Sequence, residues 1–275
     1  MILDKLRLDG PPRRVAVVTG GGRGLGREIA LALAHAGADV CIASRTQAQL
    51  DDTGAFIQSR TGRPVLAVPT DVRSSQSCDA MLAATLARFG RLDIMVNNAG
   101  VGDARGAGNR VQDLSDDDWA DAIAVNLNSA FFCSRSAVRQ FLAQGEGGVI
   151  LNVASGMGLR AAPTALGYSA AKGGVVALTR SLAAQVAGEG IRVNCIVPGF
   201  LAQKPPETDE PRERMAARGR FNTARRIGEA WEMGPLAVLL CSAASSYVTG
   251  EMFVIDGGGL AGGIAPTGYR IGEEA

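Results

Sequence analysis

The chain has few aromatic residues, no long apolar run and almost no net charge. Phe, Trp and Tyr make up 5% of the 275 residues, and the formal net charge is +1. A balance this close to neutral gives no case for nucleic acid or an anionic membrane as a partner. No apolar run reaches the roughly 18 residues that span a bilayer. The mixed, charged residues 1–7 do not resemble a secretory signal.

Cysteine is scarce, and its positions show no metal-ligand spacing, so we expect no metal site. Three of the five cysteines lie in apolar stretches and are expected to be small core residues. Thiols of this kind are typical of a reduced compartment, and we expect a cytoplasmic protein. The residues are Cys41, Cys78, Cys133, Cys195 and Cys241.

Glycine, in contrast, is abundant. Its 36 residues indicate many tight turns between strands and helices rather than disorder, given how few aromatics accompany them. The length allows one large α/β domain with ample material for a core. No internal repeat or linker divides the chain. We therefore expect a single domain over residues 1–275, with a core at about 14–259, a substrate lid at about 200–227 and a tail at 260–275.

Seven short apolar runs alternate with stretches of helical periodicity. The expected strands span residues 15–18, 40–43, 65–68, 94–96, 149–153, 191–197 and 252–255. The expected helices include 46–57, 74–89, 229–241 and a long one at 115–143, which Ser115 caps and in which Asn126 is interpreted as an exposed polar residue. Residues 1–13 are interpreted as a loose lead-in.

A glycine turn between the first strand and the first helix is the earliest chemical motif. Such a turn lets backbone N–H groups approach a pyrophosphate, whose charge the helix N-terminus favours. The spacing is G-x-x-x-G-x-G and differs from the G-x-G-x-x-G fingerprint. Its position nevertheless predicts a dinucleotide site. The candidate residues are Gly20, Gly22, Arg23, Gly24, Leu25 and Gly26.

The end of the second strand favours NADP(H) over NAD(H). An NAD site commonly has an acidic residue here to bind the ribose hydroxyls. This chain has Ser44 and then Arg45, with a second cation at Arg23, whereas Asp39 precedes the strand at its wrong end. A guanidinium suits the 2′-phosphate of NADP. We predict NADP(H), with NAD(H) as the alternative if both arginines are only solvated turn residues.

Tyr168 and Lys172 lie four residues apart and would share one face of a helix. A phenol has a pKa of about 10. A cation about 4 Å away contributes roughly 4 kcal/mol at an effective dielectric near 20, which could lower that pKa by at most about three units, since burial opposes the shift. The pair therefore predicts a general acid/base. The alternative is a packed tyrosine beside a solvated lysine.

In combination, the motifs resemble the classical short-chain dehydrogenases/reductases from about residue 14 to 259. The resemblance implies a single Rossmann-type, doubly wound domain with a parallel seven-stranded sheet in the order 3-2-1-4-5-6-7. It rests on Thr19-Gly20-x-x-x-Gly24-x-Gly26, Asn97-Asn98-Ala99-Gly100, Asn126, Ser155, Tyr168-x-x-x-Lys172 and Pro198-Gly199.

The resemblance also implies residue roles. Tyr168 would be the general acid/base, and Lys172 would lower its pKa and hold the nicotinamide ribose. Ser155 would hydrogen-bond the substrate oxygen, and Asn126 would hold a water in a proton relay. Toward the cofactor, Gly20, Gly24 and Gly26 would cradle the pyrophosphate. Further cofactor positions are Asp71 and Val72 at the adenine, Asn98 under its ribose, Ala99, Gly100, Pro198 and Gly199.

Some positions depart from the family pattern. Many members have a threonine four residues after the Gly of Pro-Gly, where this chain has Gln203. The 101–113 loop is slightly long, and a tail extends beyond Gly259. The expected substrate walls are residues 101–113, 156–167 and 200–226, in which Arg160 meets either an acid group or solvent.

These observations predict an NADP(H)-dependent oxidoreductase acting on a ketone, a 3-oxoacyl group or a secondary alcohol. One alternative is an NAD-dependent sugar or polyol dehydrogenase of the same family. Another is a non-catalytic dinucleotide-binding regulator. The family further implies a homotetramer, or a dimer, assembled through helices at 115–143 and 168–187.

Overall fold

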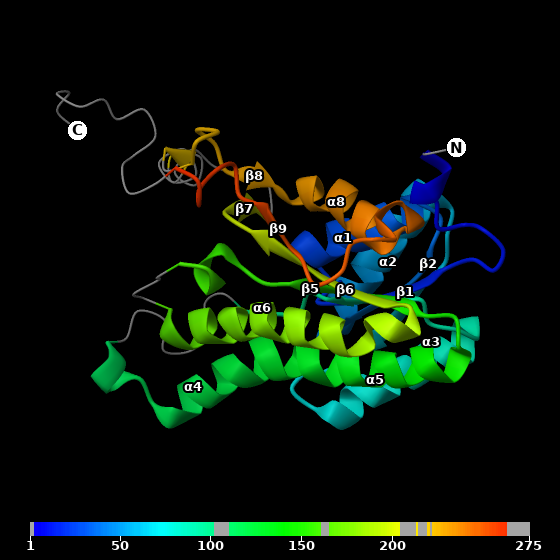
Figure 1. Ribbon diagram of the computed structural model, residues 1–275, viewed down its shortest axis with the longest axis horizontal. Coiled ribbons are helices and arrows are strands. Elements are labelled where there is room, and N and C mark those ends of the chain that lie inside the picture. Colours follow the sequence, from blue (N-terminus) through cyan, green and yellow to red (C-terminus); the bar gives the residue numbers. More distant parts are fainter. Residues whose placement is uncertain are drawn as a thin grey trace.

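The computed structural model describes residues 3–101, 110–160, 165–203, 213, 219–220 and 222–262. They form a parallel seven-stranded sheet in the order β3-β2-β1-β4-β5-β6-β9, which confirms the predicted strand order (Figure 1). The strands are β1 Val15–Thr19, β2 Asp39–Ser44, β3 Val65–Pro69, β4 Ile94–Asn97, β5 Gly148–Val153, β6 Ile191–Pro198 and β9 Met252–Ile255.

Helices cover both faces of the sheet. In Figure 1, α1, α2 and α8 lie on one face and α3, α4, α5 and α6 on the other. Their bounds are α1 Gly24–His35, α2 Gln47–Thr61, α3 Ser75–Phe89, α4 Asp116–Ile123, α5 Ser129–Gln144, α6 Leu166–Val186 and α8 Met233–Cys241. Short 3-10 turns occur at Leu3–Leu6, Val111–Asp113, Gly156–Gly158, Ala187–Glu189, Ala230–Glu232 and Ala243–Ser245.

The central strands are mainly apolar because both faces of the sheet are buried. In β1, successive side chains point to opposite faces. Ala16 and Val18 pack into the core beneath α1 and α8, whereas Val17 packs into the core beneath α3 and α5. All three are fully buried. A continuous apolar run was therefore the correct sequence signal for a strand in this sheet.

The expectation of a loose lead-in at residues 1–13 is wrong for its described part. Leu8 is only 2% exposed and belongs to the hydrophobic core. Its amide donates to the Ala36 carbonyl oxygen at 2.7 Å, and the Arg14 amide donates back to the Leu8 carbonyl oxygen at 3.0 Å. A single leucine among polar residues has no periodicity, so the sequence could not reveal this docking.

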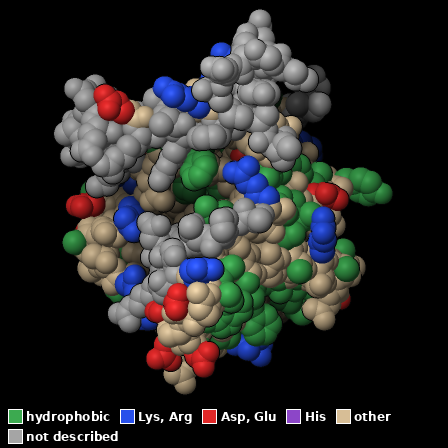
Figure 2. Space-filling model, turned by 90° about the vertical axis from the view of Figure 1, so that its left-hand side faces the viewer, with side chains coloured by type: hydrophobic (Ala, Val, Ile, Leu, Met, Phe, Trp, Pro, Cys, Tyr) green, Lys and Arg blue, Asp and Glu red, His purple; other side chains and the backbone are tan. Residues whose placement is uncertain are grey.

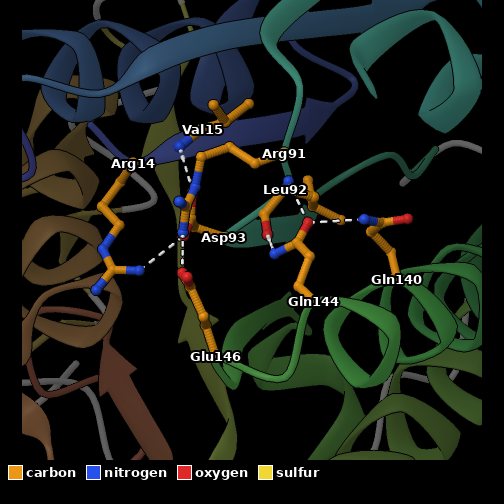
Figure 3. Close-up of polar contacts among 8 residues, drawn as sticks. All are labelled: Arg14, Val15, Arg91, Leu92, Asp93, Gln140, Gln144 and Glu146. Atoms are coloured by element: carbon orange, nitrogen blue, oxygen red, sulfur yellow. Dashed lines mark hydrogen bonds and ion pairs between the residues drawn. The ribbon is translucent and has the colours of Figure 1, made fainter. Parts of the chain in front are cut away.

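A polar cluster around Asp93 fixes the amino ends of the central strands (Figure 3). Asp93 is 3% exposed. Its carboxylate accepts from the Val15 amide at 2.8 Å, from Arg14 at 2.7 Å and from Arg91 at 2.6 Å. Arg91 also pairs with Glu146, just before β5, at 2.7 Å. The cluster thereby joins the segments that lead into β1, β4 and β5.

Gln144, the last residue of α5, makes further hydrogen bonds next to the Asp93 cluster. Its side chain accepts from the Leu92 amide at 2.9 Å and donates to the Leu92 carbonyl oxygen at 2.7 Å. Gln140 donates to the Gln144 oxygen at 2.8 Å. The end of α5 is therefore fastened to the start of β4, and the loops at the opposite end of the sheet are left to form a site.

Because of Asp93, the free energy of unfolding should decrease at acidic pH. Burial by itself would raise the pKa of Asp93, but hydrogen bonds from Arg91, the Val15 amide and Arg14 outweigh it and hold the pKa below the ordinary value. A depressed folded-state pKa contributes stability that is present above the unfolded value of about 3.9 and is lost as pH falls through the folded value. Asp93→Asn should lower the free energy of unfolding at pH 7 by roughly 1–3 kcal/mol.

Urea denaturation of wild type and Asp93→Asn at about pH 7 and about pH 3 tests this expectation. The difference between the two proteins should shrink at the lower pH, because the stability that ionised Asp93 contributes to wild type starts to fall below the unfolded pKa of about 3.9. Asp52→Asn, on the exposed face of α2, is the matched control and should change little. An equal difference at both pH values would contradict the role given to the Asp93 carboxylate.

Candidate active site

The glycine turn follows β1 directly and has no room for side chains. Gly20 has a φ of +66°, which favours glycine. A Cβ placed on Gly26 would lie 2.5 Å from Asn98 Nδ2. The side-chain Nδ2 of Asn98 in turn donates to the Thr19 carbonyl oxygen at 2.9 Å, and the backbone N–H of Asn98 donates to Thr19 Oγ1 at 3.1 Å. The loop after β4 thus fixes the shape of the turn after β1.

A cleft of about 630 Å³ opens at the carboxyl ends of the strands, above this turn. Most of the residues predicted to hold a dinucleotide line it. They are Gly20, Gly22, Arg23, Leu25, Gly26, Ser44, Arg45, Asp71, Val72, Asn98, Ala99, Gly100, Tyr168, Lys172 and Pro198.

Four predicted site residues do not line this cleft: Gly24, Gly199, Ser155 and Asn126. Gly24 packs under Gln203, whose Oε1 would lie 2.9 Å from a Cβ on Gly24. Gly199 lines a smaller neighbouring cavity, as does Ser155. Gln203 itself lines the main cleft, so the residue at the family's threonine position faces the glycine turn.

The end of β2 presents two cations and one buried hydroxyl. Arg23 and Arg45 are exposed, and neither forms an ion pair within the part of the chain that the structure describes. Ser44 Oγ is buried and has no hydrogen-bond partner among those residues. A Cβ placed on Gly22 would lie 2.7 Å from this oxygen. This end of the cleft therefore offers two guanidinium groups that form no ion pair among the described residues.

Arg73 is a lining residue that the sequence did not reveal. It donates to Asp71 Oδ1 at 3.0 Å and to Asp71 Oδ2 at 2.7 Å, and a third bond of 3.1 Å reaches Asp121 on α4. The hydrogen bonds from Arg73 hold the pKa of Asp71 below its ordinary value, and Arg45 contributes in the same direction. No local motif marks Arg73, because Asp121 lies 48 residues further along the chain.

Lys172 is buried in α6, at the inner end of the cleft. Its side chain is 3% exposed, and Nζ donates to the Val153 carbonyl oxygen at 2.8 Å. Nζ lies 5.7 Å from the centre of the Tyr168 ring, which is half-buried. The alternative of a solvated lysine is therefore wrong. Burial lowers the pKa of Lys172 to about 8, a shift that the nearby Cys195 opposes, so the amine still carries a proton at pH 7.

Asn126 does not lie exposed in a regular helix, as the sequence suggested. It is 1% exposed in a π-helical segment, Ala124–Asn128, between α4 and α5. Asn126 Oδ1 accepts from the Val101 amide at 3.0 Å, and Nδ2 donates to the Ala122 carbonyl oxygen at 3.0 Å. Such single π-turns often mark functional sites in helices.

Gly100 brings Asn126 and Lys172 together. A Cβ on Gly100 would lie 2.7 Å from Asn126 Oδ1 and 3.2 Å from Lys172 Nζ. The absence of a side chain therefore lets both polar groups approach the Gly100 backbone closely. α4, the π-turn, the loop after β4 and α6 all meet at this point.

Ser155 follows β5 and faces the smaller cavity of about 50 Å³. Its Oγ accepts from the Met157 amide at 3.2 Å, which leaves the hydroxyl hydrogen for another acceptor. Pro198 lines both this cavity and the main cleft, so the two spaces adjoin there. Tyr168 and Lys172 lie on the cleft side of that junction, and Ser155 lies on the other.

The described ends of the expected lid are paired. β7 Leu201–Ala202 and β8 Gly228–Glu229 form a short parallel sheet that the sequence did not predict. The remainder of the lid at 204–212, 214–218 and 221 lies outside the described residues, as do 102–109, 161–164 and the tail from 263 onward.

Figure 2 views the end of the molecule at which β7, β8 and the start of α6 lie. Lys and Arg side chains stand around the hollow in this face, and most Asp and Glu side chains lie nearer the edge of the view. Across the described ranges, His, Cys, Asp and Glu form no group of three or more that could hold a metal ion. No helix in those ranges is long and apolar enough to cross a membrane.

Comparison with known proteins identifies the family. A family profile described as Enoyl-(Acyl carrier protein) reductase matches residues 20–259. The 2-dehydro-3-deoxy-D-gluconate 5-dehydrogenase of Escherichia coli is 37% identical over 272 residues, covering 95% of this chain and 100% of that protein. The chain belongs to the short-chain dehydrogenase/reductase family.

Two further relatives agree with this assignment. A 3-oxoacyl-[acyl-carrier-protein] reductase of Synechocystis is 31% identical over 247 residues, covering 89% of this chain and 96% of that protein. The crystal structure of a short-chain type dehydrogenase/reductase from Mycobacterium marinum superposes with a TM-score of 0.84 at 32% identity, covering 94% of this chain and 99% of that one.

As a member of this family, the chain is an oxidoreductase acting on CH–OH or C=O groups with a nicotinamide dinucleotide cofactor. The alternative of a non-catalytic regulator is therefore not retained. The described residues fit such a cofactor: glycines of the turn line the cleft, and so do Arg23, Arg45 and Ser44, whose buried Oγ has no hydrogen-bond partner among them.

Proposed function

We propose that the chain is an NADP(H)-dependent carbonyl reductase/alcohol dehydrogenase, of the ketone or 3-oxoacyl type, in which Tyr168 transfers the proton. One observation supports this proposal above the others: Lys172 is buried, anchored on the Val153 carbonyl oxygen and lined up beside Tyr168 in the dinucleotide cleft. Burying the charge of a lysine is energetically unfavourable, and a role in the cleft accounts for its position better than a purely structural one does.

The bound nicotinamide would supply the hydride in reduction and accept it in oxidation. The substrate oxygen would lie near Pro198, where the main cleft meets the cavity of Ser155. Ser155 would donate its hydroxyl hydrogen to that oxygen, because the Met157 amide uses only one of its acceptor lone pairs and leaves the hydrogen free. Tyr168 would give its proton to the same oxygen in reduction and take it back in oxidation.

Lys172 and Asn126 would supply and restore that proton. An ammonium has three N–H donors, and one is used on the Val153 carbonyl oxygen. The others are free to reach the Tyr168 oxygen and the nicotinamide ribose. A water bridging Lys172 and Asn126, whose side chains both pack against Gly100, would continue the relay.

The preference for NADP(H) rests on charge at the end of β2. Arg23 and Arg45 line the cleft without carboxylate partners in the described ranges, whereas Arg73 is already paired with Asp71 and Asp121. No acidic residue stands where an NAD site would bind the ribose hydroxyls; Ser44 takes that place. A 2′-phosphate would meet both free guanidinium groups.

Two relatives leave the substrate class open. The Escherichia coli relative is named for a sugar acid, which favours an NAD-dependent sugar or polyol dehydrogenase as the second candidate. The Synechocystis relative is named for an acyl thioester. A cofactor-coupled panel of ketones, 3-oxoacyl thioesters and sugar alcohols discriminates these candidates.

We further propose a cytoplasmic homotetramer, or a dimer. Trp119 on α4 and Phe131 and Leu142 on α5 are large apolar side chains that are roughly half exposed, as expected of a subunit interface. All five cysteines are buried and free, which suits a reducing compartment. Light scattering that finds a monomer would contradict the assembly.

Arg45→Ala should raise the KM for NADPH roughly ten- to a hundredfold, because a charge-assisted hydrogen bond to the 2′-phosphate contributes about 1.5–3 kcal/mol. The KM for NADH should change little. Steady-state kinetics with both cofactors measures this difference, with Arg88→Ala on the exposed end of α3 as the charge-matched control. A parent enzyme that prefers NADH would overturn the NADP(H) assignment.

Tyr168→Phe should reduce turnover by about 10²–10⁴-fold, because it removes only the proton donor. Its dissociation constant for NADPH, measured by fluorescence titration, should stay nearly unchanged, since Lys172 and the glycine turn are retained. Substantial residual turnover with intact cofactor binding would refute the role of Tyr168.

A further inference from the structure

The small cavity beside Ser155 contains a positive charge that the proposed mechanism does not use. Arg160 lines this cavity together with Ser155, Met157, Phe200 and Leu260. Its volume is about 50 Å³, which is room for one small polar group rather than a long arm.

Arg160 is fixed relative to Ser155. Its backbone amide donates to the Gly156 carbonyl oxygen at 3.1 Å, within the turn that Ser155 caps. This turn packs against α6, since a Cβ on Gly158 would lie 2.7 Å from the backbone carbon of Lys172. The guanidinium donates to the Gly259 carbonyl oxygen at 3.2 Å, across 99 residues of sequence. Hydrogen bonds therefore hold both the backbone and the guanidinium of Arg160, an exposed residue.

No described carboxylate neutralises this guanidinium. Asp256 is the acidic residue among those that line the cavity. Its two oxygens accept from the Gly258 amide at 2.8 Å and the Leu260 amide at 2.7 Å. Within the described ranges, no ion pair joins Asp256 to Arg160. The Asp256 carboxylate therefore stabilises the turn that follows it, and the Arg160 guanidinium remains available to bind a ligand.

A guanidinium has five N–H donors in a planar fork. One donor of Arg160 reaches Gly259, which leaves most of the fork for a ligand. Carboxylate is the group whose geometry matches such a fork, through two parallel hydrogen bonds. Met157, Phe200 and Leu260 supply apolar walls for a short carbon chain between that carboxylate and the reacting carbonyl.

We infer that Arg160 is a specificity-determining residue that selects substrates carrying a carboxylate a few bonds from the reacting carbonyl, namely oxo acids and the corresponding hydroxy acids. The inference rests on the proposed function, because it places the substrate oxygen at Ser155. The carboxylate lies at Arg160, and the carbonyl reaches the junction at Pro198.

Matched acid and amide pairs test this inference. The acids are pyruvate, acetoacetate, 4-oxopentanoate and 5-oxohexanoate, each compared with its neutral amide of nearly the same shape. For the best-fitting length, kcat/KM of the acid should exceed that of the amide by about ten- to a hundredfold. Arg160→Ala should remove this preference mainly through KM, and Arg160→Lys should retain part of it.

The amides also serve as an internal control. The Arg160→Ala enzyme should convert the keto group of each amide to the alcohol at nearly the wild-type rate, because an amide carries no carboxylate for Arg160 to bind. Arg180→Ala, on the exposed side of α6, removes one positive charge elsewhere and should leave the preference intact. Equal reduction of acids and amides by wild type at every length would overturn the inference and leave the proposed function standing.

Calorimetry can measure the dissociation constants of the same acids for the protein saturated with NADP⁺. This measurement does not depend on turnover. Wild type should bind the best-fitting acid at least about tenfold more tightly than Arg160→Ala does. Acids that bind through Arg160 but are never reduced would support the inference and refute the proposed function. Equal binding to both proteins would refute the inference.

Discussion

The hydrogen bond from Lys172 Nζ to the Val153 carbonyl oxygen joins the helix of Tyr168 to the strand that leads into Ser155. A buried ammonium is costly unless its protons are satisfied. Here the end of β5 supplies one acceptor, and Gly100 lets both Nζ and Asn126 Oδ1 pack closely against its backbone. Displacing Lys172 would therefore disturb β5, α6 and the π-turn together. The proposed chemistry depends on this one anchored charge.

The two ends of the sheet have different roles, one in stability and the other in ligand binding. At the amino ends, Asp93, Arg91 and Gln144 close a dense set of hydrogen bonds around β1, β4 and α5. At the carboxyl ends, small residues keep the backbone open, and several polar atoms lack partners in the described ranges, Ser44 Oγ among them. Stability concentrated at one end permits unsatisfied groups at the other, which is where an α/β sheet binds its ligands.

Much of the fold was predictable because local signals sufficed. Buried parallel strands such as β1 appear as continuous apolar runs, and Ser115 does cap α4, accepting from the Asp118 amide at 3.1 Å. Leu8, the π-turn at Asn126 and the β7–β8 pair were missed because each depends on contacts distant in sequence. The same holds for Arg73 with Asp121 and for Arg160 with Gly259, which no spacing rule connects. Most residues predicted for the dinucleotide site do line the cleft, whereas Arg73 and the hydrogen-bond partners of these residues were not predictable.

The most direct test of the central claim is the titration of Lys172 itself, followed by NMR in protein labelled with ¹³C at the lysine ε-carbons and assigned with Lys172→Met. Burial beside the Val153 carbonyl predicts a pKa of about 8 for this amine in the cofactor-free protein. A Lys172 signal that titrates near the ordinary lysine value of about 10.4 would show a solvated side chain and would contradict the account.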